Sequence, residues 1–241
     1  MVVPGKIALV GSGEYLPAMT ELENQLLSEG IKQGKNPLYI QIPTAAGQES
    51  KQRIQYWKDL GKAQADNLEV EVRFLQVFNR EDAFNPEHVS MIEDGALIYM
   101  SGGDPHYLAH VLSDTPLWDA IYKNWSSGAS LAGCSAGAMV LSKEIPNFRF
   151  LKREPTTGLN LLPSIRVIPH FDKFFRWIPD SAAKVLMQAP EDTVLVGIDE
   201  MTALVQSSTE NEWSVFGRSA VHILQGSPTQ QLRQGEKIVI P

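Results

Sequence analysis

Cysteine is scarce in this sequence: of 241 residues, only Cys134 is a cysteine. A single cysteine excludes an intrachain disulfide framework and is compatible with a reducing compartment. The first residues, Met1–Lys6, also lack the basic region and long apolar core of a signal peptide. We therefore expect a cytoplasmic protein.

Long hydrophobic runs and an excess of basic residues are absent as well. Because no apolar stretch is long enough to span a bilayer, we expect no membrane segment. The formal net charge is -7 and the pI is near 5.3. An acidic chain argues against a nucleic-acid partner, because binding to phosphates needs a basic face.

The sequence does have the composition of a globular protein, with 43% hydrophobic and 20% charged residues. Its length is enough to bury one sizeable core. No internal repeat, low-complexity tract or interdomain linker interrupts it. We therefore expect a single domain over residues 1–241.

Apolar runs that predict buried strands alternate with segments of helical apolar spacing. The expected strands are Lys6–Val10, Pro37–Pro43, Glu69–Leu75 and Ala96–Met100, and the expected helices are Met19–Lys32, Lys51–Asp66 and Pro86–Glu93. This alternation predicts an α/β fold: a three-layer sandwich with a mainly parallel central sheet. We expect a long loop over Lys143–Leu162 and a strand-rich segment over Thr193–Pro241.

One hexapeptide, Gly133-Cys134-Ser135-Ala136-Gly137-Ala138, stands between two apolar runs. Small residues around Ser135 fit the sharp strand-to-helix turn of a nucleophile elbow, which leaves the serine hydroxyl projecting from the sheet. The following helix would direct free N–H groups and the positive end of its dipole toward Ser135. The alternative is an ordinary turn with an N-capping serine.

Three other segments accompany this hexapeptide, namely Tyr99–Asp104, Ile168–Asp172 and Val196–Val205. Together, the Gly-x-Ser-Ala-Gly-Ala, His-Phe and Gly-Ile-Asp-Glu-x-Thr-Ala motifs resemble the family of serine peptidases that contains dipeptidase E and cyanophycinase. The resemblance runs from Gly11 to Gly217, which is nearly the whole chain. It implies a class I glutamine amidotransferase-like fold and a serine peptidase that cleaves a small peptide or peptide-like amide through an acyl-enzyme on Ser135.

His170 is the expected general base, since a serine hydroxyl is a poor nucleophile until a base takes its proton. It follows an apolar run that ends in a proline, as at the catalytic edge of a doubly wound sheet. The His-Phe motif of the family falls on the same residue. His106, near the Gly-Gly turn, remains an alternative.

The acid that orients the base has several candidates. We favour Glu200, which ends the Gly-Ile-Asp-Glu segment, and then Asp172, two residues after His170. The spacing of Asp172 is similar to the His-x-Glu of glutamine amidotransferases. Glu144 and Glu154 lie in the loop after the elbow helix, where some relatives carry their acid.

The resemblance also implies an oxyanion hole formed by the backbone N–H groups of Gly103 and Ala136. Such a donor stabilises the alkoxide of the tetrahedral intermediate by about 3 kcal/mol. The residues expected to line the substrate site are Gly102, Asp104, Lys173 and Arg176.

The sequence departs from the family pattern at two places. Pro105 stands where relatives usually carry glutamine, and only Lys173 and Arg176 remain of an arginine-rich run. Specificity for aspartyl dipeptides or cyanophycin therefore does not carry over, because lysine replaces a bidentate arginine poorly. Two other functions stay open: a glutaminase-like subunit that passes ammonia to a partner, and a non-catalytic binding protein.

Neither a cofactor nor a metal is expected. The Gly11-Ser12-Gly13 turn invites a dinucleotide site, but Leu16 stands where the third glycine would be. A cysteine mechanism is disfavoured because Cys134 precedes the central position of the elbow and should point into the core. A homodimer is a further expectation.

Overall fold

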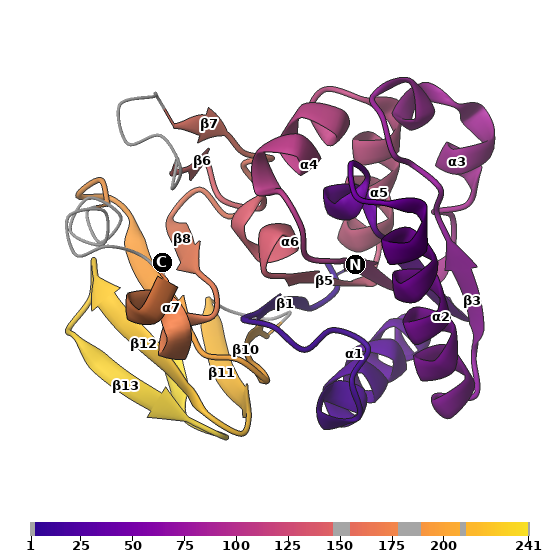
Figure 1. The fold of residues 1–241 in the computed structure, drawn as a ribbon. Helices are drawn as coiled ribbons and strands as arrows, with labels where there is room; N and C mark the ends of the chain where they lie inside the picture. The colour runs from indigo at the N-terminus through magenta and orange to yellow at the C-terminus, as the bar shows by residue number, and fades with distance from the viewer. Residues whose placement is uncertain (1–2, 147–154, 178–188, 208–210, 241) are drawn as a thin grey trace.

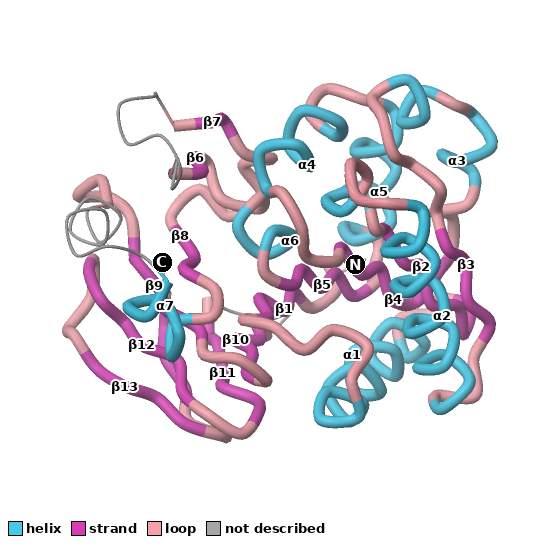
Figure 2. The backbone as a smooth tube through the Cα atoms, viewed as in Figure 1, coloured by secondary structure: helices cyan, strands magenta, loops and turns pink. Residues whose placement is uncertain are grey.

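An eight-stranded sheet runs through the middle of the molecule (Figures 1 and 2). The computed structural model describes residues 3–146, 155–177, 189–207 and 211–240. In order across the sheet, the strands are β14 (Lys237–Val239), β11 (Glu212–Gly217), β10 (Thr202–Gln206), β1 (Ile7–Val10), β5 (Ser130–Cys134), β4 (Gly95–Met100), β2 (Asn36–Ile42) and β3 (Glu71–Phe74). The five from β1 to β3 are parallel, as the sequence predicts, and the other three are antiparallel.

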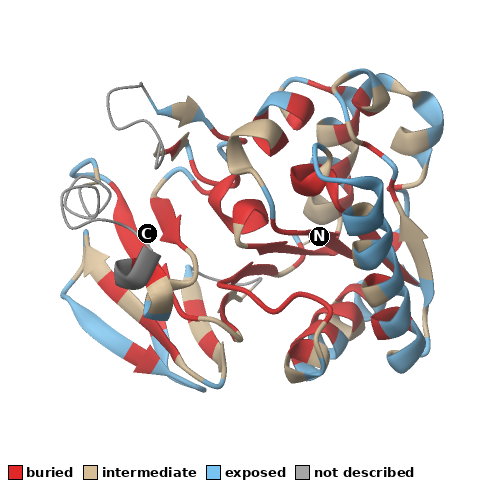
Figure 3. Ribbon diagram, in the orientation of Figure 1, coloured by how far each residue is buried: buried red, intermediate tan, exposed pale blue. Residues whose placement is uncertain are grey.

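Helices cover both faces of this sheet because its strands send alternate apolar side chains in opposite directions. In β1, Ala8 and Val10 pack against the helices on one face of the sheet. Ile7 and Leu9 pack against the helices on the opposite face. The first face carries α1 (Thr20–Lys32) and α2 (Lys51–Asn67); the second carries α3 (Pro86–Ser90), α4 (Pro105–Leu112), α5 (Pro116–Ser126) and α6 (Ala136–Met139). Short 3-10 helices are η1 (Pro17–Met19), η2 (Thr44–Ala46) and η3 (Glu81–Phe84). This confirms the predicted three-layer α/β fold, and Figure 3 shows the central strands buried.

A second sheet of four strands stands beside the first (Figure 1). Its order is β13 (Gln230–Arg233), β12 (Ala220–Gln225), β9 (Val194–Ile198) and β8 (Ile165–Ile168). Apolar residues of β9 belong to the same hydrophobic cluster as Leu9 of the main sheet, which supports the proposal of one domain. Helix α7 (Phe171–Trp177) follows β8. The strand-rich end of the chain was predicted, but its division between two sheets was not.

The segment expected as a loop over Lys143–Leu162 contains two short strands. These are β6 (Glu144–Ile145) and β7 (Thr156–Thr157), paired antiparallel. The loop prediction is therefore wrong at these positions, because pairing across the segment outweighs its proline and glycine content. Among the described residues, no helix combines the length and apolar character needed to cross a membrane.

Candidate active site

Ser135 lies in the turn between β5 and α6, where the sequence predicts it. Its backbone is strained, with φ 50° and ψ -108°. The turn leaves no room for side chains on its flanks: a Cβ on Gly133 would lie 2.2 Å from the Gly137 carbonyl oxygen, and one on Gly137 would lie 2.2 Å from the Met100 carbonyl oxygen. The small residues of the hexapeptide thus let the elbow close.

His170 and Glu200 lie in line with Ser135. The hydroxyl of Ser135 donates to His170 Nε2 over 3.2 Å, and His170 Nδ1 donates to Glu200 Oε1 over 3.0 Å. The carboxylate fixes this tautomer, because it accepts a proton-bearing Nδ1 and leaves Nε2 free to accept. His170, like Ser135, has a positive φ, 51°, at the junction between a strand and a helix. The arrangement can move a proton from the hydroxyl to the imidazole.

Lys173 and Asp172 both contact Glu200. Lys173 Nζ forms an ion pair with Glu200 Oε2, and Asp172 Oδ1 accepts from the Glu200 backbone N–H over 3.0 Å. Burial raises the pKa of Glu200, but the hydrogen bonds from Lys173 and His170 outweigh it and hold that pKa below its ordinary value. Glu200 is therefore a carboxylate at neutral pH, and Asp172 supports the segment that carries it.

The expected oxyanion donors belong to two segments that meet at the elbow: Ala136 follows Ser135, and Gly103 follows Gly102, on which a Cβ would lie 3.4 Å from Ser135 Cβ. Among the described residues, no carbonyl or side chain of another segment accepts a hydrogen bond from the Gly103 N–H or from the Ala136 N–H. The Gly102 N–H is occupied instead, because it donates to Glu14 Oε1 over 2.9 Å. Helix α6 has only four residues, so its dipole adds little. Stabilisation of a negative charge near Ser135 would therefore come from individual N–H groups.

Cys134 belongs to a buried hydrophobic cluster of the main sheet. Its side chain is fully buried, and its Sγ donates to Glu14 Oε2 over 2.9 Å. Burial and the neighbouring Glu14 carboxylate raise the pKa of the Cys134 thiol well above its ordinary value. A thiol held in its neutral form is a poor nucleophile, which disfavours a cysteine mechanism.

The remaining candidates that the structure describes have partners other than His170. Asp104 caps α4 by accepting from the N–H groups of His106 and Tyr107, and His106 Nδ1 contacts Thr156 Oγ1 at 2.7 Å. Glu144 forms an ion pair with Arg166. Glu154 lies outside the described residues. Arg176 belongs to α7, but its side chain also lies outside the described part.

Sequence reasoning missed the role of two side chains. Glu14 directly follows the Gly11-Ser12-Gly13 turn and had no expected role, yet its carboxylate reaches the elbow and the Gly-Gly loop. Lys173 was expected to meet substrate and is bound to Glu200. A charged residue directly after a strand-end Gly-x-Gly was the available signal for Glu14. Within the described ranges, no group of three or more metal-binding side chains is found.

Comparison with known proteins shows which family this chain resembles. Cyanophycinase from Synechococcus elongatus is 34% identical over 164 residues, which are 64% of this chain and 49% of the relative. Cyanophycinase from a Nostoc species is 29% identical over 221 residues, 84% of this chain and 68% of the relative. The chain thus spans about half the length of the first of these relatives.

Two solved structures share the fold. The crystal structure of a peptidase from an acI-B1 Actinobacterium has a TM-score of 0.96 and 58% identity, and the match covers 99% of this chain and 98% of that one. A Listeria monocytogenes protein named after peptidase E has a TM-score of 0.63 and 20% identity, covering 90% and 100%, and shows the fold alone. The model of peptidase family S51 matches residues 7–212. The chain therefore belongs to peptidase family S51.

Proposed function

We propose that this chain is a serine peptidase that hydrolyses a small peptide or peptide-like amide through an acyl-enzyme on Ser135. The observation that carries the proposal is the continuous chain of hydrogen bonds from the Ser135 hydroxyl through His170 to Glu200. Membership of peptidase family S51 supports the same reaction.

The reaction follows from the roles that these groups can take. His170 accepts the Ser135 proton as the oxygen attacks the amide carbon, and Glu200 stabilises the imidazolium that forms. The N–H groups of Gly103 and Ala136 hold the negative oxygen of the tetrahedral intermediate. His170 then gives the proton to the leaving amine, and a water attacks the acyl-enzyme by the same route.

The two competing functions have less support. A glutaminase of the related amidotransferases needs a cysteine nucleophile, but Cys134 is fully buried and bonded to Glu14. A non-catalytic binding protein has no need for the strained backbone at Ser135, which costs on the order of 1–3 kcal/mol. A cytoplasmic location and a homodimer remain proposals.

A fluorophosphonate probe tests the nucleophile. The wild type should be labelled on Ser135, and Ser135→Ala should lose the label, because only an activated serine attacks phosphorus. Ser130→Ala is the matched control: Ser130 is a serine of β5, the strand that precedes Ser135, and its hydroxyl donates to the Leu26 carbonyl 2.7 Å away. Labelling that survives in Ser135→Ala, or is absent from the wild type, contradicts the proposal.

A further inference from the structure

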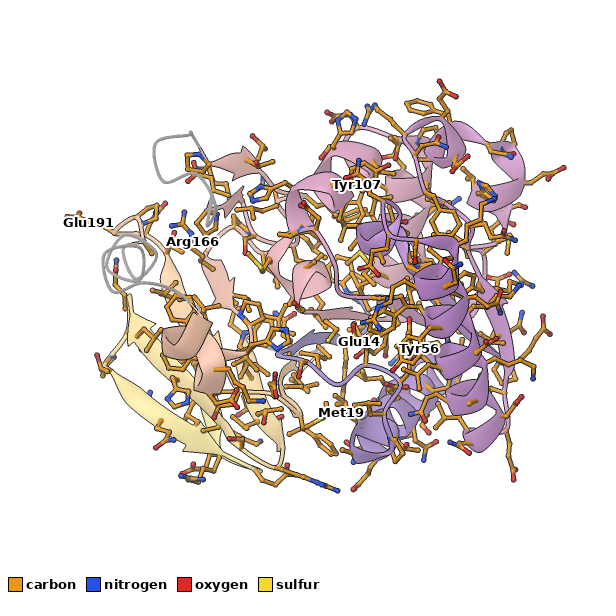
Figure 4. The ribbon with its side chains drawn as sticks, in the orientation of Figure 1. Glu14, Met19, Tyr56, Tyr107, Arg166 and Glu191 are labelled. Carbon is orange, nitrogen blue, oxygen red and sulfur yellow. The ribbon has the colours of Figure 1, made fainter. Side chains whose placement is uncertain are left out.

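Glu14 lies beside the nucleophile elbow and outside the chain of hydrogen bonds from Ser135 to Glu200. It follows β1, and only 7% of it is exposed (Figure 4 places it near the middle of the molecule). Strands β1, β5 and β4 are consecutive parallel neighbours, with Val10 opposite Cys134 and Met100 opposite Gly133. The segments that follow these three strands therefore leave the same edge of the sheet, with the elbow in the middle.

The Glu14 carboxylate joins the elbow to the loop that follows β4. One oxygen accepts from the Gly102 N–H at 2.9 Å, and the other accepts from Cys134 Sγ at 2.9 Å. Gly102 directly precedes Gly103, and Cys134 directly precedes Ser135. One side chain thus contacts the neighbour of a proposed oxyanion donor and the neighbour of the nucleophile.

The loop that carries Gly103 is held from two sides. On the side of β2 and η2, Ser101 N–H donates to the Ile42 carbonyl at 3.1 Å and Asp104 N–H donates to the Ala45 carbonyl at 2.8 Å. On the side of the elbow, the Gly102 N–H bond to Glu14 is its counterpart. Tyr15 Oη also contacts Ser101 Oγ at 3.1 Å on this side, but it is Glu14 that bonds to the backbone of Gly102 itself.

The close packing around Gly102 also ties the position of the loop to that of the Glu14 carboxylate. A Cβ on Gly102 would lie 2.9 Å from Glu14 Oε1 and 3.4 Å from Ser135 Cβ. The Gly102 backbone therefore fills the gap between the carboxylate and the nucleophile. A shift of the carboxylate would let this backbone move relative to Ser135.

We propose that Glu14 is a positioning residue that sets the distance between the Gly103 N–H and Ser135, so that the oxyanion hole is formed before substrate binds. This inference rests on the proposed serine peptidase function. Preorganised donors act on the transition state because no rearrangement is needed at the moment of reaction. Glu14 touches no reacting atom, so its effect passes through Gly102 and Cys134.

The test measures the rate of fluorophosphonate labelling in Glu14 variants. The phosphoryl oxygen of the probe needs the same N–H donors as a peptide oxyanion, so a displaced loop slows labelling. Glu14→Leu should slow labelling by about 10²-fold, the effect of a misplacement of about 1 Å or of one lost donor. Glu14→Gln should label close to the wild-type rate, because its amide oxygen still accepts from the Gly102 N–H.

Asn124→Leu is the matched control for lost stability. Asn124 is 5% exposed and donates two buried hydrogen bonds, to the Ile92 and Gly95 carbonyls, at the opposite end of β4. This variant should lose as much Tm as Glu14→Leu and keep the wild-type labelling rate. If Asn124→Leu slows labelling equally, Glu14 acts through stability alone and the inference is wrong.

The outcomes separate this inference from the proposed function. A wild type that is not labelled on Ser135 overturns the proposed function. A labelled wild type with Glu14→Leu labelled at the same rate overturns the positioning role alone. Should Glu14→Leu not fold, hydrogen exchange in the wild type decides: a Gly102 amide that exchanges as fast as an exposed loop amide contradicts the inference, and a protected amide supports it.

Discussion

At the scale of single residues, Glu200 binds two cationic or proton-donating partners at once. One oxygen accepts from His170, and the other forms the ion pair with Lys173. Each partner limits the rotation of the carboxylate, so the imidazole is held through a side chain that is itself held. The acid therefore orients the base, as well as stabilising its charge.

Glu200→Gln should lower the rate of fluorophosphonate labelling by about 10³–10⁴-fold, because an amide can hold the wrong tautomer of His170. Asp172→Asn is the comparison, since its amide oxygen still accepts from the Glu200 N–H. We expect that variant to stay close to the wild-type rate. The reverse ranking of the two variants would assign the acid to Asp172.

Substrate preference should follow from the engagement of Lys173. Its ammonium is bound to Glu200, so it offers little to a substrate carboxylate. We therefore expect a weak or absent preference for an amino-terminal aspartate, and better tolerance of neutral or aromatic side chains. A dipeptide library scored by mass spectrometry measures this. Selective cleavage of Asp-Leu over Ala-Leu and Phe-Leu would contradict it and leave the serine mechanism intact.

Local sequence was enough to propose Ser135 and His170, whereas for the acid it favoured Glu200 and left Asp172 open. A nucleophile elbow is a feature of six adjacent residues, whereas the distance from His170 to Glu200 depends on a strand pairing. Strands β8 and β9 are parallel, with Ile168 opposite Gly197. The residues that follow both strands therefore meet at one edge, and the sequence holds no local sign of that register.

At the scale of elements, α7 packs on β9 where β9 has a glycine. A Cβ on Gly197 would lie 2.6 Å from the ring of Phe171, the first residue of α7 and the neighbour of His170. The centroids of the Phe171 and His222 rings also lie 4.7 Å apart. His222 Nε2 in turn contacts Asp199 Oδ1 at 3.0 Å. The position of His170 thus depends on how closely this helix approaches the sheet.

Gly197→Ala should displace Phe171 and with it His170, lowering the labelling rate by up to about 10²-fold. Phe171→Leu in the same chain should restore part of the rate, because a smaller side chain leaves room for the new methyl group. Labelling kinetics of the single and double variants measure this coupling. A double variant as slow as Gly197→Ala would count against steric displacement of α7.

The positions of the strands and helices could be predicted better than the pairing of the strands into sheets. The apolar runs of β1, β2 and β4 predict buried strands, and the helical spacing predicts α1 and α2 within a few residues. The run in β9 looks the same, yet this strand belongs to the four-stranded sheet. Sheet membership is decided by distant pairing, which local spacing does not record.

At the scale of the whole molecule, one buried acid should make stability depend on pH. Glu23 is fully buried, and this burial raises its pKa to about 7, despite hydrogen bonds from Gln64, Tyr39 and Tyr15 that lower it. A carboxyl with a raised folded-state pKa binds its proton more tightly in the folded protein. Its contribution to stability is complete below the unfolded pKa of roughly 4.3 and is lost as the pH rises to about 7.

The free energy of unfolding should therefore lose a contribution on the order of 3 kcal/mol from Glu23 between pH values of about 4.5 and 7.5. Glu23→Gln has no proton to lose, so its stability should fall less over this range. Urea unfolding of both proteins at a series of pH values measures the difference. Parallel curves for the two proteins would show that Glu23 does not titrate in this window.

The three proposed catalytic side chains do not belong to one sheet. Ser135 follows a strand of the eight-stranded sheet, His170 follows a strand of the four-stranded sheet, and Glu200 lies in the connection from β9 to β10, which crosses from the second sheet to the first. The proposed hydrolytic activity consequently depends on the alignment of the two sheets. A small opening between them would separate the three side chains while each sheet keeps its own strands paired. We therefore expect the proposed activity to be lost at a lower temperature than the one at which the chain unfolds.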